Sequence, residues 1–383
     1  MKRLCGASVL WLIAATPLLG ADLSDKISIH GYGGWAAGAS DPYPYLAGRG
    51  EGDPEVENVE ASLLVSARPS DKLRIVFAPF WATQQVEGET EEVAEIELAF
   101  AEWDYSEALR FQIGRSRLPF GIYTEIFDIG TLRPLYDLPQ AIYGHTGFVT
   151  EFYDGFGLGG RRSLASGWDL TYDLYLGGAE FETDEPFEAV LEEGDGGGDE
   201  EGESNIEALT GFRIDASTAS GVSFGVSAFA GEPEAAGDQA TASSPSWGDY
   251  RSYGVHLEVE RGDWVLRSEF GRHDEDEFNN TAGYLELSYR LDPRWQLAAR
   301  YDHADAQFVE DLPETADSLL RHREAALGLN YWFDSNLVLR LSYHAIDGNL
   351  FTHPDHETLV EQVANGELDD SSSLILFGAQ FSF

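Results

Sequence analysis

The chain has 383 residues and carries 24 basic against 68 acidic side chains, a formal net charge of −44. Hydrophobic residues make up 43 % and aromatic residues 13 % of it, too much for an acidic chain that stays disordered. The charge argues against nucleic acid as a partner, because binding a phosphate backbone needs a basic surface.

Residues 1–21 have the features of a secretory signal peptide. Two basic residues precede the apolar run 4–19, which ends at two small residues. This run is shorter than the roughly 20 residues that span a bilayer as a helix. Cleavage after Ala21 would remove Cys5, the only cysteine, and with it any disulfide or thiolate metal site. We expect a signal peptide and one domain, 22–383.

The remainder alternates apolar and polar residues in segments of about ten. Leu339 and Leu341, for example, alternate with Arg340 and Ser342. A period of two places successive side chains on opposite faces of a strand. The segment 93–105 fits poorly, because carboxylates fall on both faces, and we expect a bulge or a short strand there.

The connections between these segments alternate between short and long. Gly, Pro, Asp, Asn and Ser are the residues of tight turns, and they form seven short connections at 69–72, 106–107, 165–167, 216–221, 262–263, 292–293 and 334–336. The eight long connections fall near 39–57, 85–92, 117–151, 179–205, 232–248, 273–281, 304–321 and 347–372. Fifteen connections join sixteen strands. This layout predicts an all-β fold, a transmembrane antiparallel β-barrel with short periplasmic turns and long extracellular loops.

Aromatic residues near predicted strand ends distinguish this barrel from a soluble β-sandwich or propeller, which would also alternate. Interfacial girdles require such residues, and they are Trp35, Trp81, Trp103, Tyr105, Trp168, Tyr289, Trp295, Tyr331 and Trp332. The last strand is apolar on one face as far as Phe383, and in this it resembles the C-terminal strand of outer-membrane proteins.

One region resembles a particular porin family. The segment 95–121 contains Gly114-x-x-x-x-Pro119-Phe120-Gly121 after two strand-like stretches, and it resembles the strand–turn–strand of the phosphate-selective porin family and its relatives. The resemblance implies that this element opens a long loop folded into the pore and that the segment 153–159 leaves it. The Lys-rich pore chemistry of that family is missing, since only two lysines follow residue 21, so phosphate specificity does not follow.

Two groups of charged residues are candidates for a pore. A barrel of sixteen strands leaves a water-filled lumen unless something narrows it, and the loop 117–151 would narrow it. Arginines on the polar faces would form a basic wall opposite the loop, where charge effects are focused. The alternative is that they pair with inward carboxylates. The wall consists of Arg74, Arg110, Arg213, Arg267, Arg290, Arg300 and Arg340, and the constriction of Arg115, Arg117, Glu125, Asp128, Arg133 and Asp137.

The segment Glu180–Asn205 carries twelve carboxylates and no basic residue. Such runs are usually solvated, although carboxylate oxygens also suit divalent cations. No metal site is assigned, since neither this segment nor His353 and His356 has a recognisable ligand spacing.

Together these features predict an outer-membrane porin that passes small hydrophilic solutes or ions by diffusion. We expect no cofactor and no catalysis, because His30, His256 and His344 accompany no nucleophile motif. The alternatives are a barrel that sheathes a partner such as an electron-transfer protein and, less favoured, an outer-membrane enzyme. The expected partners are membrane lipid, lipopolysaccharide and solutes, with a homotrimer and loop-bound divalent cations as further candidates.

Overall fold

The computed structural model describes residues 21–24, 26–46, 48–49, 55–86, 89–127, 129–144, 148–183, 202–233, 250–275, 278–308, 313–352 and 356–383. Apart from Ala21, the predicted signal peptide lies outside these residues. So do Asp128, His353 and the acidic segment 184–201.

The described strands form one sheet in which neighbours in sequence pair with each other. Sixteen of them build the wall; two short ones, β1 (Ala21–Ser24) and β3 (Gly48–Arg49), pair with β2. The wall strands are β2 (Ile27–Asp41), β4 (Glu55–Ser70), β5 (Leu73–Val86), β6 (Glu89–Ser106), β7 (Leu109–Arg117), β8 (Phe152–Ser163), β9 (Trp168–Thr183), β10 (Gly202–Thr218), β11 (Val222–Gly231), β12 (Tyr250–Arg261), β13 (Trp264–Glu275), β14 (Phe278–Arg290), β15 (Trp295–Phe308), β16 (Arg321–Trp332), β17 (Leu337–Asp347) and β18 (Ser371–Ser382). The sheet closes because β18 pairs antiparallel with β2. The sixteen-stranded antiparallel barrel is confirmed.

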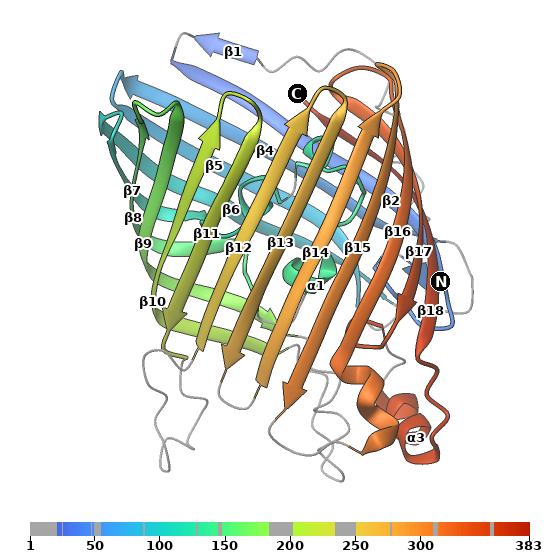
Figure 1. Cartoon of the computed structure of the whole chain (residues 1–383). Coiled ribbons are helices and arrows are strands. Elements are labelled where there is room, and N and C mark those ends of the chain that lie inside the picture. Colours follow the sequence, from blue (N-terminus) through green and yellow to red (C-terminus); the bar gives the residue numbers. More distant parts are fainter. Residues whose placement is uncertain are drawn as a thin grey trace, which may run out of the picture.

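The two ends of the barrel differ, as Figure 1 shows. All seven predicted turns join strands at one end, the turn end, and at the other, the loop end, strands lead into the long connections. Two connections expected to be long, 85–92 and 273–281, are mostly strand. β5 pairs with β6 out to Val86 and Glu89, and β13 with β14 out to Glu275 and Phe278. The prediction of long connections there was wrong because the hydrogen bonds between paired strands use the backbone. Strands can therefore continue beyond the apolar belt even where their side chains are polar.

The two faces of the wall are oriented as the alternation predicts. Leu63, Ile113 and Leu341 point outward and are 47, 63 and 47 % exposed. Arg340 and Ser342, which flank Leu341 in the sequence, are buried inside the barrel. An apolar exterior around a polar interior reverses the arrangement of a soluble protein and is typical of a barrel in lipid.

One expected member of the aromatic girdle points the other way. Trp332 is buried inside the barrel, where the guanidinium carbon of Arg290 lies 5.1 Å from its ring centre. Its neighbour Tyr331 remains on the outer face and packs edge-on against Trp295. Successive residues of a strand alternate faces, so only one of two adjacent aromatic residues can join the girdle.

The irregular segment 93–105 belongs to β6 and contains a bulge. Ala78 pairs with Leu98 but Pro79 pairs with Ile96, which leaves Glu97 as an extra residue. The bulge is confirmed, but the strand is long, with 18 residues. Glu97 turns inward and accepts hydrogen bonds from Tyr32 (2.6 Å) and a nearby serine (3.0 Å). The shift in phase explains why carboxylates seemed to occupy both faces.

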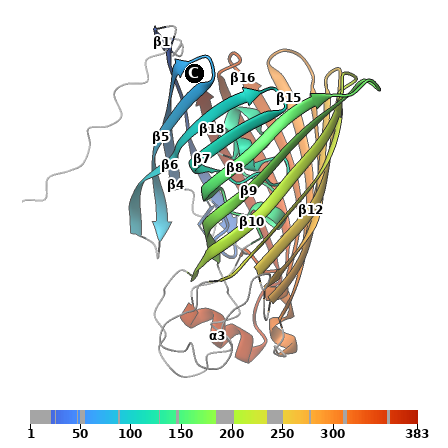
Figure 2. The same cartoon turned by 90° about the vertical axis from the view of Figure 1, so that its left-hand side faces the viewer.

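The main core lies inside the barrel. Loop residues such as Phe120, Ile142 and Phe148 pack against inward aromatic side chains of the wall, including Phe229 and Tyr250. At the loop end a second cluster joins η5 (Glu314–Leu320) to α3 (His356–Asn365), seen at the bottom of Figure 2. No helix among the described residues is long and apolar enough to span a membrane.

Candidate functional site

The connection between β7 and β8, residues 118–151, runs through the barrel interior and is called the constriction loop below (Figures 1 and 2). It contains η2 (Thr124–Ile126), η3 (Gly130–Leu132) and α1 (Gln140–Tyr143). Its entrance depends on Gly121, which has a φ of 56° and lies so close to the Glu269 carboxylate that a Cβ would collide with it. The expected loop inside the lumen, with β8 leaving it, is confirmed.

Buried acids of β13 and β14 hold this loop near its entrance and at the end of α1. Glu269 on β13 accepts hydrogen bonds at Oε1 from the Tyr143 hydroxyl (2.6 Å) and from the backbone N–H of Ile122 (3.1 Å). Tyr123 donates in the same way to Glu286 on β14. Burial, reinforced by the adjacent carboxylates, raises the pKa of both tyrosine hydroxyls well above the ordinary value. They therefore remain donors at neutral pH.

The second half of the loop is held by strands farther round the wall. The backbone N–H of Gln140 donates to Oδ2 of Asp302 (3.0 Å). The Asn330 side-chain amide donates to the carbonyl of Pro134 (2.7 Å). These hydrogen bonds fasten the loop to the wall from β13 to β16, in addition to its apolar packing on β11 and β12.

Open space remains on the opposite side of the loop. A cavity of about 360 Å³ separates the residues around η2 from the inner faces of β9 to β13. Four carboxylates line it against two guanidinium groups, which gives the cavity an acidic bias. The charged lining consists of Glu125, Asp173, Arg213, Asp215, Glu258 and Arg267.

The predicted basic wall divides into two parts. Arg74 and Arg110 face open space, with 33 and 37 % of their side chains exposed, and both contact Glu102 (3.0 and 3.5 Å). Arg110 also contacts Asp173 at 2.8 Å. Arg213 and Arg267 reach the cavity, and they pair with Asp215 (2.9 Å) and Glu258 (2.6 Å), respectively.

Arg300 and Arg340 do not face the cavity, because the loop covers them. Arg300 is 3 % exposed and contacts Asp137, Asp302 (3.1 Å) and Glu324 (3.1 Å). Arg340 is 2 % exposed and donates to the side chain of Gln380 and to a loop carbonyl. These two arginines fasten the loop to the wall.

The charged residues of the constriction are likewise scattered. Asp137 is buried against Arg300, whereas Glu125 is half exposed and contacts Arg213 at 3.1 Å. Both contact wall arginines directly, so they do not stand across the passage from them as expected. Arg133 is buried beside the Arg340 guanidinium.

Two further arginines lie where β7 joins the constriction loop. Arg115 pairs with Asp154 at 3.0 Å, and Arg117 pairs with Glu151 at 2.6 Å. Together with Glu97, which lies 3.9 Å from Arg117, they form a charged group at the level of the loop.

The carboxylates that pair with the wall arginines were not singled out from the sequence. In the ladder Glu102 is directly opposite Arg74, Asp173 opposite Arg213, and Glu258 opposite Arg267. Opposite charges at facing positions of adjacent strands attract each other. The strand register, had it been known, would have identified Glu102 and Glu258, but not Asp173, which pairs with Arg110 two strands away.

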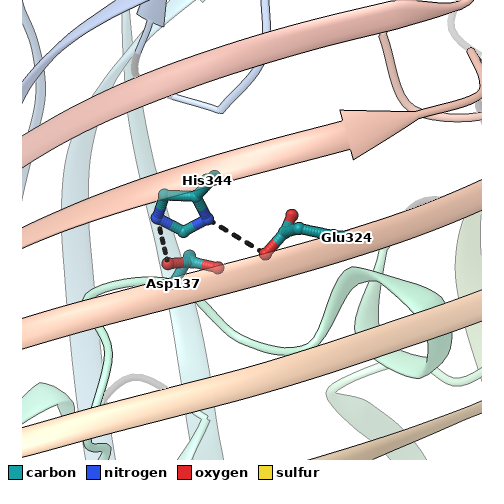
Figure 3. A group of neighbouring side chains, drawn as sticks. All are labelled: Asp137, Glu324 and His344. Carbon is teal, nitrogen blue, oxygen red and sulfur yellow. Dashed lines mark hydrogen bonds and ion pairs between the residues drawn. The ribbon is translucent and has the colours of Figure 1, made fainter.

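A buried acid–imidazole cluster was also missed. Figure 3 shows His344 between Glu324 and Asp137, with Nδ1 3.0 Å from Glu324 Oε1 and Nε2 3.8 Å from Asp137 Oδ1. Asp302 and His322 adjoin it, and two groups of three residues, which share Glu324, bring ligand-type atoms within 4.8 Å of one another. The sequence offers no local motif, because these residues come from β15, β16, β17 and the loop.

Part of this cluster has the hydrogen-bond order of a hydrolase triad. Ser342 Oγ lies 2.7 Å from His344 Nε2, and His344 Nδ1 lies 3.0 Å from Glu324. All three side chains are at most 3 % exposed, and Arg300 contacts the Glu324 carboxylate. A substrate could not reach this serine, so the arrangement supports a structural role.

No family model and no curated protein matches the chain. Solved structures do match, among them the outer membrane channel DcaP of Acinetobacter baumannii (10 % identity, 93 % of this chain and 97 % of that one, TM-score 0.58). The anion-selective porin from Comamonas acidovorans (9 %, 93 and 99 %, 0.57) and OmpF of Salmonella typhi (14 %, 93 and 97 %, 0.56) also match. At this identity they show the fold alone: the chain has the fold of outer-membrane porins.

Proposed function

We propose that the protein is an outer-membrane channel for passive diffusion of small hydrophilic solutes or ions. The observation that carries the proposal is the water-accessible, charged cavity between the constriction loop and β9–β13, inside a barrel with an apolar exterior. Porin-like channels have this combination of a polar lumen, an inserted loop and a lipid-facing belt. The turn end would face the periplasm and the loop end the exterior.

We further propose a preference for cations. The cavity has twice as many carboxylates as guanidinium groups, and two arginines of the predicted basic wall are covered by the loop. The chain therefore resembles the phosphate-selective porin family in the Pro119-Phe120-Gly121 turn and in the loop that this turn opens. We do not infer from this resemblance that phosphate is the solute.

A sheath around a partner protein is the alternative. It is less favoured because the constriction loop itself occupies the lumen and leaves a cavity of about 360 Å³. A homotrimer, lipopolysaccharide contacts and divalent cations at the acidic loops remain predictions.

Planar-bilayer recording of the purified protein tests the proposal. We expect steady ohmic steps, and a several-fold larger step after deletion of residues 123–147, since that segment fills the lumen. A deletion of residues 188–198, within the acidic segment, should leave the step size unchanged. Absence of any open state in both the intact and the loop-deleted protein would contradict a channel.

A further inference from the structure

His322 on β16 is a buried imidazole that has no hydrogen-bond partner among the described residues. Its side chain has no exposed surface, and neither Nδ1 nor Nε2 makes a hydrogen bond within that part of the chain. The Phe351 ring lies 4.9 Å away and the Tyr45 ring 6.1 Å away, measured between ring centres. Buried polar groups nearly always have a hydrogen-bond partner, so a buried group without one calls for an explanation. A bound ion that contacts the ring nitrogen is one such explanation.

Two carboxylates lie beside this ring. Glu324 follows two residues later on the same inner face, and Asp302 of β15 stands directly opposite Glu324 in the ladder. The ligand-type atoms of the three residues lie within 4.8 Å of one another, and His322 Nε2 is 3.9 Å from Glu324 Oε2. All three side chains are at most 1 % exposed.

The charge of the cluster is unbalanced. One guanidinium, that of Arg300, contacts three carboxylates: Asp137, Asp302 and Glu324. The carboxylates thus outnumber the guanidinium three to one. Buried charge is unfavourable unless it is paired or binds a metal, and a divalent cation would offset this excess of carboxylates.

We propose that Asp302, His322 and Glu324 bind a divalent first-row transition-metal ion, with Zn²⁺ the best match. One imidazole nitrogen and two carboxylates are ligands that suit Zn²⁺, and they leave its fourth position to water. Outer hydrogen bonds already orient both carboxylates, since Tyr45 donates to Glu324 and the Gln140 backbone donates to Asp302 (3.0 Å). The site is independent of which solute the channel passes.

The neighbouring group in Figure 3 is a poorer candidate. Both ring nitrogens of His344 already have partners, Ser342 Oγ at 2.7 Å and Glu324 Oε1 at 3.0 Å. The Arg300 guanidinium contacts carboxylates of both groups, so the ring nitrogens of the two histidines are what distinguish them. The ion is therefore assigned to His322.

Titration with Co²⁺, a spectroscopic substitute for Zn²⁺, tests the site in the full mature chain after chelator treatment in detergent. We expect one tightly bound ion per barrel, seen as visible d–d absorption that Zn²⁺ displaces. H322Q and D302N should each weaken binding at least tenfold. The matched control is H303Q, since His303 lies next to Asp302, faces outward and pairs with Asp305 (3.1 Å) at the surface; it should leave binding unchanged.

H344Q separates the two groups, and we expect it to weaken binding less than H322Q does. A loss confined to H344Q, or equal losses in H303Q and H322Q, would overturn the proposal. Should H322Q fail to fold, judged by heat-dependent migration in gels, pulsed EPR of Cu²⁺ bound to the H303Q protein replaces it. A nitrogen coupling from imidazole supports the site, and its absence refutes it.

Discussion

Tyr143 and Glu269 join the constriction loop to the barrel wall through a hydrogen bond of 2.6 Å from the phenol to Oε1. Tyr143 ends the short helix α1, and Glu269 lies in the middle of β13. The same oxygen also accepts from Ile122 at the beginning of the loop. One buried carboxylate thus fastens two loop positions that are 21 residues apart in sequence.

Tyr143→Phe should loosen the loop without breaking the barrel. A hydrogen bond to a charged group contributes about 1.5–3 kcal/mol, and Glu269 Oε1 keeps its other bonds, from Ile122 and Tyr284. We expect a loss of that size in urea unfolding and noisier open-channel current. Tyr172→Phe, which removes a partly exposed tyrosine at the turn end that donates to the Ala108 carbonyl, should change stability by less than about 0.5 kcal/mol.

Alkaline pH should weaken the same anchor. The folded-state pKa of Tyr123 and Tyr143 is raised by burial and by Glu286 and Glu269. The unfolded chain therefore loses these protons first, near pH 10, and stability falls as the pH rises further. We expect a steeper decline between pH 9.5 and 11 in the parent protein than in the Tyr123→Phe/Tyr143→Phe variant. Identical slopes would show that these hydroxyls do not titrate differently on folding.

Arg300→Met should be severely destabilising. The substitution leaves Asp137, Asp302 and Glu324 buried without their guanidinium partner, and breaking a buried ion pair in this way typically costs about 3–5 kcal/mol. Arg161→Met is the control, because the Arg161–Asp169 pair is largely exposed and such pairs contribute little to stability. Tryptophan fluorescence during urea unfolding measures both, and equal effects would contradict the buried role of Arg300.

Cysteine labelling should separate the two parts of the basic wall. Cysteine at Arg110 should react with a membrane-impermeant thiol reagent in liposomes, because this position faces open space. Cysteine at Leu63 should be protected by lipid, and cysteine at Arg340 by the constriction loop. Rapid labelling at Arg340 would mean that the loop does not cover this side of the lumen.

Ion selectivity should respond in opposite directions to the two partners of one ion pair. Arg110 and Asp173 contact each other at 2.8 Å beside the cavity. Arg110→Ala should increase the cation preference and Asp173→Asn should reduce it, as reversal potentials in a KCl gradient would show. Both effects should persist near 0.15 M salt, where screening acts over about 8 Å, because an ion in the narrow lumen passes closer than this to both side chains. Shifts of the same sign would argue that neither side chain faces the ions.

The sequence by itself determined the barrel. Alternation of residues such as Leu341 and Ser342 requires a strand with one apolar and one polar face, and the seven turn motifs determine the strand count and the direction of each hairpin. The resemblance of the Pro119-Phe120-Gly121 turn to the phosphate-selective porin family implied where the inserted loop begins, and the observed φ of 56° at Gly121 is one that glycine adopts without strain.

Only the tertiary structure decided which inward charges face water. Arg110 and Arg300 both point inward from their strands, but the constriction loop covers Arg300 and leaves Arg110 exposed. The pairing of Asp302, His322 and Glu324 depends on the register between β15 and β16 and on packing by the loop. Alternation specifies the face on which a side chain lies, whereas its partners come from strands and loops distant in sequence, and no local pattern encodes those contacts.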